Sequence, residues 1–278
     1  MPDDTLLVAA AQMSSQDDVG KNLARAGELV EEAAARGARL VLLPENFAYM
    51  GTEEGRLEVA EAIDGPERGP IVKSLARAAQ KSGVHVIAGG MPERSADPKR
   101  PHNASIVVAP DGALVARYRK IHLFDVDVGD GHAYRESANT SAGNEAPAVV
   151  DIGGFRVGLS ICYDLRFPEL YRKLSDRGAE VITVPAAFTL ATGKDHWHVL
   201  LRARAIEAQA YVVAAAQWGT HPRGRRTYGK SLVADPWGEI IAQRSEGEGI
   251  VLATIDRAYL RHVRQSLPSL THRRPNVC

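Results

Sequence analysis

The sequence contains little cysteine and carries no net charge. Only two of its 278 residues are cysteines, Cys162 and Cys278. Two such distant thiols form neither the disulfide framework of a small secreted domain nor a cluster of metal ligands. The 34 Lys and Arg residues balance the 34 Asp and Glu residues, so the overall charge would attract neither nucleic acid nor an acidic membrane surface. We therefore expect no metal, no nucleic-acid partner and no membrane partner.

Long apolar runs are also missing. No stretch reaches the roughly 20 apolar residues that span a bilayer. The first residues, MPDDTLLVAAAQ, lack the basic region and apolar core of a signal peptide. These absences predict a cytoplasmic protein.

Short apolar strands alternate with amphipathic helices along the chain. The segments LLVAAAQM, ARLVLLPE, VHVIAGG, FRVGLSIC and AEVITVPAAF are apolar throughout, which predicts strands covered by helices on both faces. The segment FPELYRKLSDRG predicts a helix with Pro168 in its first turn and Gly178 after its end. Asp195 is the predicted N-cap of the helix DHWHVLLRARAIEAQA. Because no linker rich in Pro, Gly or Ser interrupts the series, we expect an α/β fold in a single domain over residues 1–278, with a short C-terminal tail from about residue 268.

Three predicted strands end in residues that can perform acyl transfer. LVLLP is followed by Glu45, ALVARYR by Lys120 and VGLSI by Cys162. In sheets covered by helices, ligand sites lie at the carboxyl ends of the strands. A nearby lysine and a helix N-terminus favour the nucleophilic thiolate, and a carboxylate can pass the thiol proton to a departing amine. Each residue taken alone has a structural interpretation: Glu45 could be a cap, Lys120 a solvated strand end and Cys162 a core residue. Together the three predict a catalytic site.

The blocks LPENF, YRKIHLFD and CYDLRFPEL resemble the three signature blocks of the nitrilase superfamily of carbon–nitrogen hydrolases. The resemblance continues through YGKSLVADPWGE to HRRPN and so covers essentially the whole chain. It implies a four-layer α-β-β-α sandwich that assembles as a homodimer or a larger homo-oligomer. It also implies a Glu45–Lys120–Cys162 triad with Cys162 as the nucleophile, and a second glutamate, Glu136, that positions Lys120 and aids proton transfer.

These residue types and the resemblance together suggest a mechanism. Cys162 attacks the carbonyl carbon of an amide, and Lys120 and the Tyr163 backbone N–H stabilise the resulting oxyanion. Glu45 protonates the leaving amine, which leaves a thioester, and then activates the water that releases the acid. This chemistry requires no cofactor.

The segment HWHVLLRARAIEAQAYVVAAAQWGTH is most similar to the Nit branch of the superfamily, which includes the Nit part of Nit–Fhit fusion proteins. That resemblance implies hydrolysis of deaminated glutathione to 2-oxoglutarate and cysteinylglycine, a metabolite-repair reaction. An ω-amidase that acts on 2-oxoglutaramate is the alternative. A non-catalytic binding or scaffold protein on the same fold is a third possibility.

Both substrates carry a 2-oxo acid carboxylate, which requires a cation or backbone donors. Arg166 is the predicted cation because it lies within a turn of Cys162, although an ion pair with Asp164 or Glu169 is an equally good interpretation. We expect Phe188 and Thr189, at the end of VITVPAAF, to border the same cleft.

Other motifs carry less weight. Residues 224–231, GRRTYGKS, match the P-loop pattern, but the following LVADPWG predicts a strand rather than the helix that a P-loop needs. His196 and His198 lie two apart on a helix and so face different sides, which argues against a metal site. Ser160 suggests a serine hydrolase only weakly, because it lies inside a strand and its GLSIC segment lacks the second glycine of a nucleophile elbow.

Overall fold

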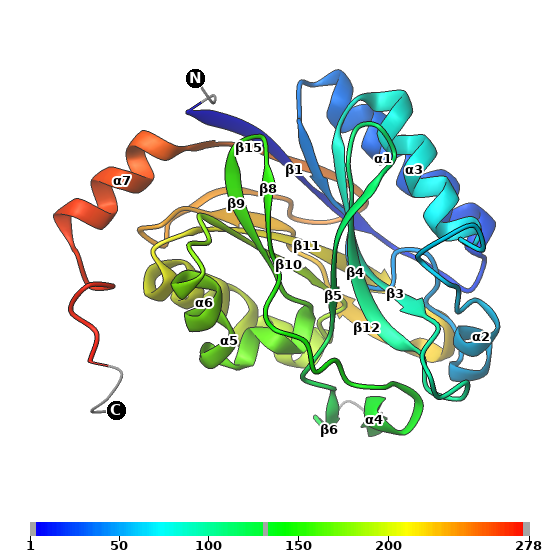
Figure 1. Cartoon of the computed structure of the whole chain (residues 1–278). Helices are drawn as coiled ribbons and strands as arrows, with labels where there is room; N and C mark the ends of the chain where they lie inside the picture. Colours follow the sequence, from blue (N-terminus) through cyan, green and yellow to red (C-terminus); the bar gives the residue numbers. More distant parts are fainter. Residues whose placement is uncertain (1–3, 130–132, 275–278) are drawn as a thin grey trace.

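The computed structural model describes residues 4–129 and 133–274 (Figure 1). Its helices are α1 (Val19–Ala35), α2 (Glu53–Glu58), α3 (Pro70–Ser82), α4 (Glu136–Asn139), α5 (Pro168–Asp176), α6 (Leu190–Ala208) and α7 (Arg257–Ser266). Its strands are β1 (Thr5–Met13), β2 (Leu40–Leu42), β3 (His85–Glu93), β4 (His102–Val108), β5 (Leu114–Arg119), β6 (Asp125–Asp127), β7 (Ala133–Arg135), β8 (Val149–Ile152), β9 (Phe155–Leu159), β10 (Val181–Ala186), β11 (Tyr211–Thr220), β12 (Arg226–Tyr228), β13 (Leu232–Ala234), β14 (Ile240–Gln243) and β15 (Gly249–Asp256).

Most strands belong to one large sheet whose two halves pack against each other as layers. One half has the order β5-β4-β3-β2-β1, with β15 antiparallel to β1. The other has the order β11-β10-β9-β8, with β13 antiparallel to β11 and β14 beside β13. The halves join where β1 runs parallel to β11, pairing Gln12 with Ala216 and Met13 with Gln217. Helices α1 and α3 cover one outer face and α5 and α6 cover the other (Figure 1), which confirms the predicted four-layer α-β-β-α sandwich.

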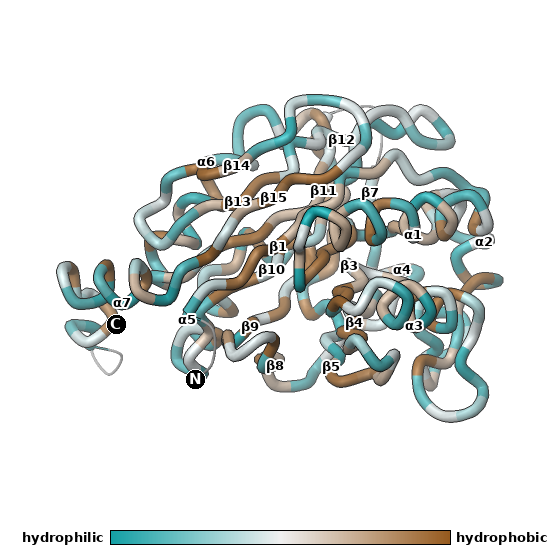
Figure 2. The backbone as a smooth tube through the Cα atoms, turned by 90° about the horizontal axis from the view of Figure 1, so that it is seen from above, coloured by the Kyte–Doolittle hydropathy of each residue, from teal (hydrophilic) through white to brown (hydrophobic). Residues whose placement is uncertain are grey.

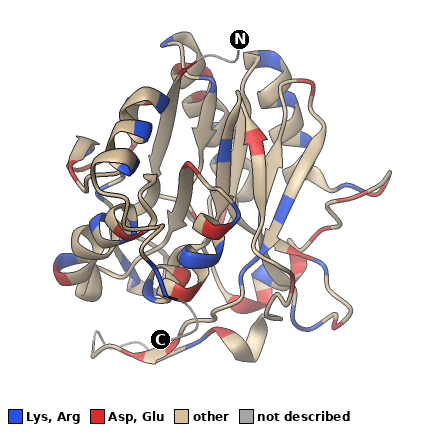
Figure 3. Cartoon of the chain, turned by 60° about the vertical axis from the view of Figure 1, so that its left-hand side comes forward, with Lys and Arg blue, Asp and Glu red and all other residues tan. Residues whose placement is uncertain are grey.

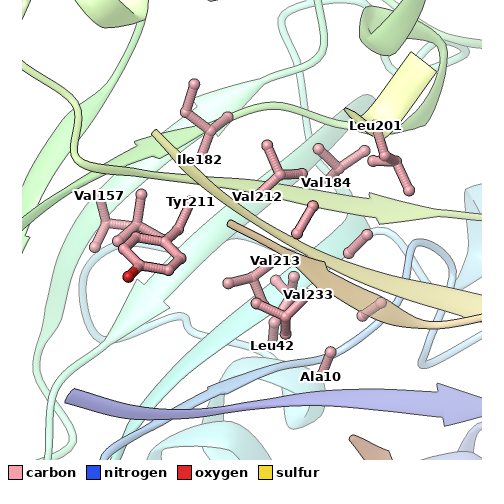
Figure 4. Packing of buried hydrophobic residues seen from close by; sticks show 14 of the residues in the cluster. Ala10, Leu42, Val157, Ile182, Val184, Leu201, Tyr211, Val212, Val213 and Val233 are labelled. Atoms are coloured by element: carbon pink, nitrogen blue, oxygen red, sulfur yellow. The ribbon is translucent and has the colours of Figure 1, made fainter. Parts of the chain in front are cut away.

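The layers follow from the two-residue repeat of a strand, which sends successive side chains to opposite faces. In β2, Leu40 and Leu42 belong to the apolar cluster between the layers, together with Val213 of the other half (Figure 4). Val41, between them, packs in the outer cluster with Leu29 of α1. The central strands are accordingly the most apolar part of the chain, while hydrophilic residues gather on outer helices and loops (Figure 2).

Two helix starts show how local sequence sets the boundaries. Helix α5 begins at Pro168 and is followed by Gly178 with φ of 80°, as predicted, because proline suits the first turn and glycine the left-handed position beyond the end. Helix α6, in contrast, begins at Leu190 and not near Asp195. Its cap is Thr189, whose hydroxyl accepts a hydrogen bond from the Thr192 N–H at 3.3 Å.

The extra turn of α6 contains a glycine, Gly193, which precedes the predicted N-cap at Asp195. Gly193 is buried against the side chain of Tyr228, and a Cβ at this position would collide with that ring. Gly193 therefore allows close packing between α6 and β12 and does not interrupt the helix.

The segment that matches the P-loop pattern has no P-loop structure. Its residues Arg226–Tyr228 form β12, which pairs antiparallel with β11. The next element is the strand β13 instead of a helix. The phosphate-binding helix N-terminus that the motif requires is absent from residues 224–234, in agreement with the sequence interpretation.

The C-terminal part of the chain packs through α7, whose Leu260 and Val263 are buried. From Leu267 to residue 274 the chain forms turns, and Cys278 lies outside the described residues. A single domain with a tail from about residue 268 remains our interpretation. No helix in the described part of the chain has the length and apolar character of a transmembrane span. Lys and Arg are interspersed with Asp and Glu on the face seen in Figure 3.

Candidate active site

The strands that precede the three predicted catalytic residues all run in the same direction. Strand β2 runs parallel to β1, and β5 shares its direction because two antiparallel pairings separate β5 from β3. Strand β9 shares it too, through the parallel pairings of β10 and β11 with β1. Their carboxyl ends therefore meet at one end of the sandwich. Glu45, Lys120 and Cys162 come together there, from both layers.

Lys120 lies at the centre of this cluster. Its Nζ donates to Glu45 Oε1 at 3.0 Å and to Glu136 Oε2 at 2.8 Å. The second oxygen of Glu45 accepts a hydrogen bond from the Ala187 N–H at 2.9 Å, and the Glu45 carboxylate is near enough to the Cys162 thiol to raise the pKa of that thiol. The ammonium, the thiol and the Glu45 carboxylate are all buried.

Burial and neighbouring charges fix the protonation states of this cluster. Burial opposes the charged form of Lys120, but Glu136 and Glu45 outweigh it and raise its pKa, so the side chain is an ammonium. Burial also opposes ionisation of Glu136, but Lys120 and Arg56 lower its pKa to about 2. Burial and the Glu45 carboxylate raise the pKa of Cys162, and Lys120 only partly compensates. The resting nucleophile is thus a thiol, not the thiolate that a lysine and a helix N-terminus alone would favour.

Glu136 lies at the start of the short helix α4, not in solvent as a loop acid would. Besides Lys120, its carboxylate accepts hydrogen bonds from the Phe124 N–H at 2.7 Å and from Asn103 Nδ2 at 3.2 Å. Asn103 Nδ2 also donates to Glu45 Oε1 at 2.9 Å. One amide and one ammonium therefore link the two glutamates.

The chain turns sharply at the nucleophile. Cys162 has a φ of 48°, a left-handed conformation that costs energy for any residue with a Cβ. Immediately behind it, the fully buried Asp164 accepts hydrogen bonds from the Ile161 N–H at 2.8 Å and from the Tyr118 hydroxyl at 2.7 Å. His122 Nδ1 lies 2.7 Å from Asp164, on its other carboxylate oxygen. This network holds the turn.

The turn exposes a backbone donor next to the thiol. Within the described residues, no group accepts a hydrogen bond from the Tyr163 N–H, and Tyr163 itself lines the cavity in front of Cys162. This is the position predicted for an oxyanion donor.

A cavity of about 220 Å³ opens in front of the cluster. Phe188 and Thr189 line it, as expected, but Arg166 does not. The Arg166 guanidinium stacks over the Phe188 ring, 5.2 Å from its centroid. Within the described part of the chain, neither Asp164 nor Glu169 forms an ion pair with Arg166, so the alternative structural role is not found there.

Comparisons with known proteins agree with this geometry. The profile of the carbon–nitrogen hydrolase family matches residues 7–265. The chain is a carbon–nitrogen hydrolase. It is 49% identical over 269 residues to a Synechocystis protein named deaminated glutathione amidase, covering 96% of this chain and 97% of the relative. It is 42% identical over 275 residues to the Homo sapiens protein of the same name, covering 98% of this chain and 83% of the relative.

The solved structures place the hydrolase in the nitrilase superfamily. The crystal structure of the Caenorhabditis elegans NitFhit protein superposes on this chain with a TM-score of 0.93 and 38% identity, covering all of this chain and 67% of that one. Saccharomyces cerevisiae Nit3, a member of branch 10 of the superfamily, superposes with a TM-score of 0.85 and 33% identity, covering 95% of this chain and 94% of that one.

Three residues of this hydrolase's site were missed by the sequence analysis. Asn103 is the second residue of β4, and the start of this antiparallel strand lies at the same end of the sheet as the carboxyl end of β3. That rule could have found it. Arg56 and Arg225 also line the cavity, but α2 was not predicted and Arg225 was considered only as part of the P-loop pattern.

The weaker candidates of the hydrolase lie elsewhere. The Ser160 hydroxyl is fully buried and donates to the Thr183 carbonyl at 2.8 Å, so it has a structural role. His198 Nε2 lies 2.9 Å from Gln243, and His196 Nδ1 lies 3.3 Å from Arg166. No group of three or more His, Cys, Asp or Glu residues within 4–129 and 133–274 could hold a metal ion.

Proposed function

We propose that this protein is an amidase that hydrolyses deaminated glutathione to 2-oxoglutarate and cysteinylglycine. The observation that carries the proposal is the buried cluster of Glu45, Lys120 and Cys162 at the base of a cavity lined by further cations. Relatives that share 42–49% identity along nearly the whole chain are named deaminated glutathione amidase, which supports this substrate.

The first half of the reaction forms a thioester. The Cys162 sulfur attacks the amide carbonyl carbon while its proton passes to Glu45, because burial keeps the resting thiol protonated. The carbonyl electron pair moves onto oxygen, and Lys120 Nζ and the Tyr163 N–H stabilise the oxyanion. As the oxyanion collapses, the C–N bond breaks and Glu45 returns the proton to the amine nitrogen of cysteinylglycine.

The second half of the reaction consumes water. Glu45 takes a proton from water as its oxygen attacks the thioester carbon, and the same two donors stabilise the second oxyanion. Collapse breaks the C–S bond and releases 2-oxoglutarate, and the proton on Glu45 returns to the sulfur. Glu136 keeps Lys120 charged and in place throughout. The Asn103 amide donates to both Glu136 and Glu45 and so links the two carboxylates.

The acyl part of the substrate lies beside Phe188 and Thr189 in this proposal. Arg166, stacked on Phe188, is the cation that attracts the 2-oxo acid carboxylate once the side chain turns toward the cavity. An uncharged side chain would not supply this attraction.

The test is the release of 2-oxoglutarate from deaminated glutathione and from 2-oxoglutaramate, measured side by side, with Cys162→Ala as the control. We expect a higher kcat/KM for deaminated glutathione and loss of both activities in the variant. Preference for 2-oxoglutaramate would make the protein an ω-amidase with the same mechanism. Cleavage of neither substrate, together with a Cys162 that iodoacetamide does not label, would favour a non-catalytic binding protein.

We further propose that the protein forms a homodimer or a larger homo-oligomer. Helix α6 exposes Val199 and Ile206, and the neighbouring β13–β14 hairpin exposes Trp237 and Ile241. Gathered apolar side chains of this size favour burial against another copy. Light scattering of the purified protein gives the molecular mass that tests this assembly. A cytoplasmic location is the accompanying proposal, because a reducing compartment keeps a nucleophilic thiol free.

A further inference from the structure

Two arginines line the cavity and lack protein acceptors for part of their guanidinium groups. Arg56 comes from α2 and Arg225 from the loop before β12. The Nε and Nη2 atoms of Arg56 and the Nε atom of Arg225 are shielded from solvent, and no described group accepts a hydrogen bond from them. A charged donor that has left water without gaining an acceptor is costly, so these atoms point to an anionic ligand.

Other contacts hold the Arg225 side chain, and Arg56 lies near a catalytic carboxylate. The Arg225 guanidinium lies over the Tyr134 ring, 5.5 Å from its centroid, and its Nη2 donates to the Ala187 carbonyl at 3.4 Å. Arg56 is close enough to Glu136 to lower the pKa of that carboxyl group. Both guanidiniums therefore face the same space as the catalytic cluster.

The charged lining of the cavity has a surplus of cations. Among the described residues, the lining carboxylates are Glu45, Glu53 and Glu136, and the lining cations are Arg56, Lys120, Arg135 and Arg225. Since Lys120 is paired with two of the carboxylates and serves the oxyanion in the proposed mechanism, the arginines are the groups left to bind a substrate carboxylate. A guanidinium matches a carboxylate well because its planar fork donates two parallel hydrogen bonds.

The two candidate substrates differ in the number of their carboxylates. Both carry the 2-oxo acid carboxylate on the acyl side. Only deaminated glutathione carries a second one, at the glycine end of its leaving group. We propose that Arg56 and Arg225 bind this glycine carboxylate and make a dianionic amide the preferred substrate. This inference rests on the proposed amidase function and assigns the leaving-group side of the same cavity, while Arg166 serves the acyl side.

The first experiment leaves the protein unchanged and alters the substrate. The wild-type enzyme is assayed with deaminated glutathione and with the same compound carrying a glycinamide end, which replaces only the second carboxylate by a neutral amide. We expect kcat/KM to fall by about 10- to 100-fold with the glycinamide compound, as for the loss of hydrogen bonds to a charged group. An unchanged kcat/KM would overturn the inference.

The second experiment alters the arginines. Arg225→Gln and Arg56→Gln should each lower kcat/KM for deaminated glutathione by about tenfold or more, mainly through KM. For the glycinamide compound the same variants should lose much less, because their partner is already missing. An equal loss on both compounds would overturn the inference, since it would mean that the arginines act on catalysis or on the acyl carboxylate.

The controls separate this inference from the proposed function. Arg226→Gln changes an exposed arginine next to Arg225 and should leave the ratio of the two kcat/KM values at the wild-type level. Retained labelling of Cys162 by iodoacetamide shows that each variant keeps its active site. If the wild-type enzyme cleaves neither deaminated glutathione nor 2-oxoglutaramate, the proposed function fails and this inference fails with it. If it cleaves both equally well, only this inference fails.

Discussion

Two buried carboxylate networks flank Cys162, and they are held in different ways. In front of the thiol, Glu45 and Glu136 share the ammonium of Lys120. Behind it, Asp164 receives its hydrogen bonds from a phenol, an imidazole and two backbone N–H groups, and no described lysine or arginine pairs with it. Of the two networks, the front one therefore contains the lysine, at the place where a proton and a developing oxyanion must be handled.

The two networks therefore have different roles: the front one takes part in the reaction, and the back one positions the nucleophile. The front network is suited to exchange a proton with the thiol, because Glu45 and Cys162 line the same cavity and the Glu45 charge acts on the pKa of the thiol. The back network is not, because Asp164 faces away from the cavity and ties the turn at Ile161 to Tyr118 on β5. Substitutions in the front network should therefore lower the rate by changing the charges around the thiol. Substitutions in the back network should lower it by shifting the thiol and the Tyr163 N–H.

The largest effect should come from removing the shared cation. Lys120→Met deletes an oxyanion donor, and we expect kcat/KM to fall by about 1,000-fold or more. It also leaves two buried carboxylates side by side, which should lower the free energy of unfolding by about 3–5 kcal/mol. Steady-state kinetics and urea denaturation measure the two effects. Lys173→Met, at an exposed position of α5, is the control, and activity above one tenth of wild type in Lys120→Met would contradict the assigned role.

A smaller effect should follow from loosening the turn behind the nucleophile. Asp164→Asn replaces an acceptor by an amide that cannot accept all the present hydrogen bonds, so the Tyr163 N–H should shift. We expect kcat to fall by about 100-fold, as for small misplacements of catalytic groups, with little change in KM. Tyr118→Phe removes only one donor and should cost about 2- to 10-fold.

Asp164 would prove merely structural if its variant lost stability and kept the wild-type kcat at a temperature where it is folded. Thermal unfolding followed by circular dichroism sets that temperature. Kinetics of Asp164→Asn and Tyr118→Phe measured below it then isolate the positional effect.

The smallest effect concerns pH. The pKa of Glu136 is about 2 in the folded protein, against an ordinary value of 4.5. Its ion pair with Lys120 therefore contributes stability that is fully present above about pH 4.5 and is lost as the pH falls toward 2. The free energy of unfolding of wild type should fall more steeply over this interval than that of Glu136→Gln. Glu169→Gln, at an exposed position, should keep the wild-type slope, and equal slopes for wild type and Glu136→Gln would contradict the pairing.

Much of the fold follows from local sequence, because the periodicity of apolar residues predicts the strands and the amphipathic helices. The convergence of Glu45, Lys120 and Cys162 follows as well, since each ends a strand and these strands share one direction. The start of α6 was predicted wrongly because Gly193 serves packing against Tyr228, a tertiary contact that a local pattern does not contain.

The cavity wall was harder to predict for a similar reason. Arg56 stands on a six-residue helix whose sequence has no marked apolar face, and Asn103 carries no signal beyond its place at the start of a strand. The protonation of Cys162 was also unpredictable. It depends on the balance between burial, a carboxylate and an ammonium, and only the folded structure fixes their relative weights.

The junction between β1 and β11 has a consequence for the enzyme as a whole. Glu45 and Lys120 follow strands of one half of the sheet, Cys162 follows a strand of the other, and the halves are joined edge to edge by two register pairs. Neither half holds a working set of groups, so catalysis is a property of the closed sandwich. The rate of turnover is thereby a reporter of whether the two layers are docked.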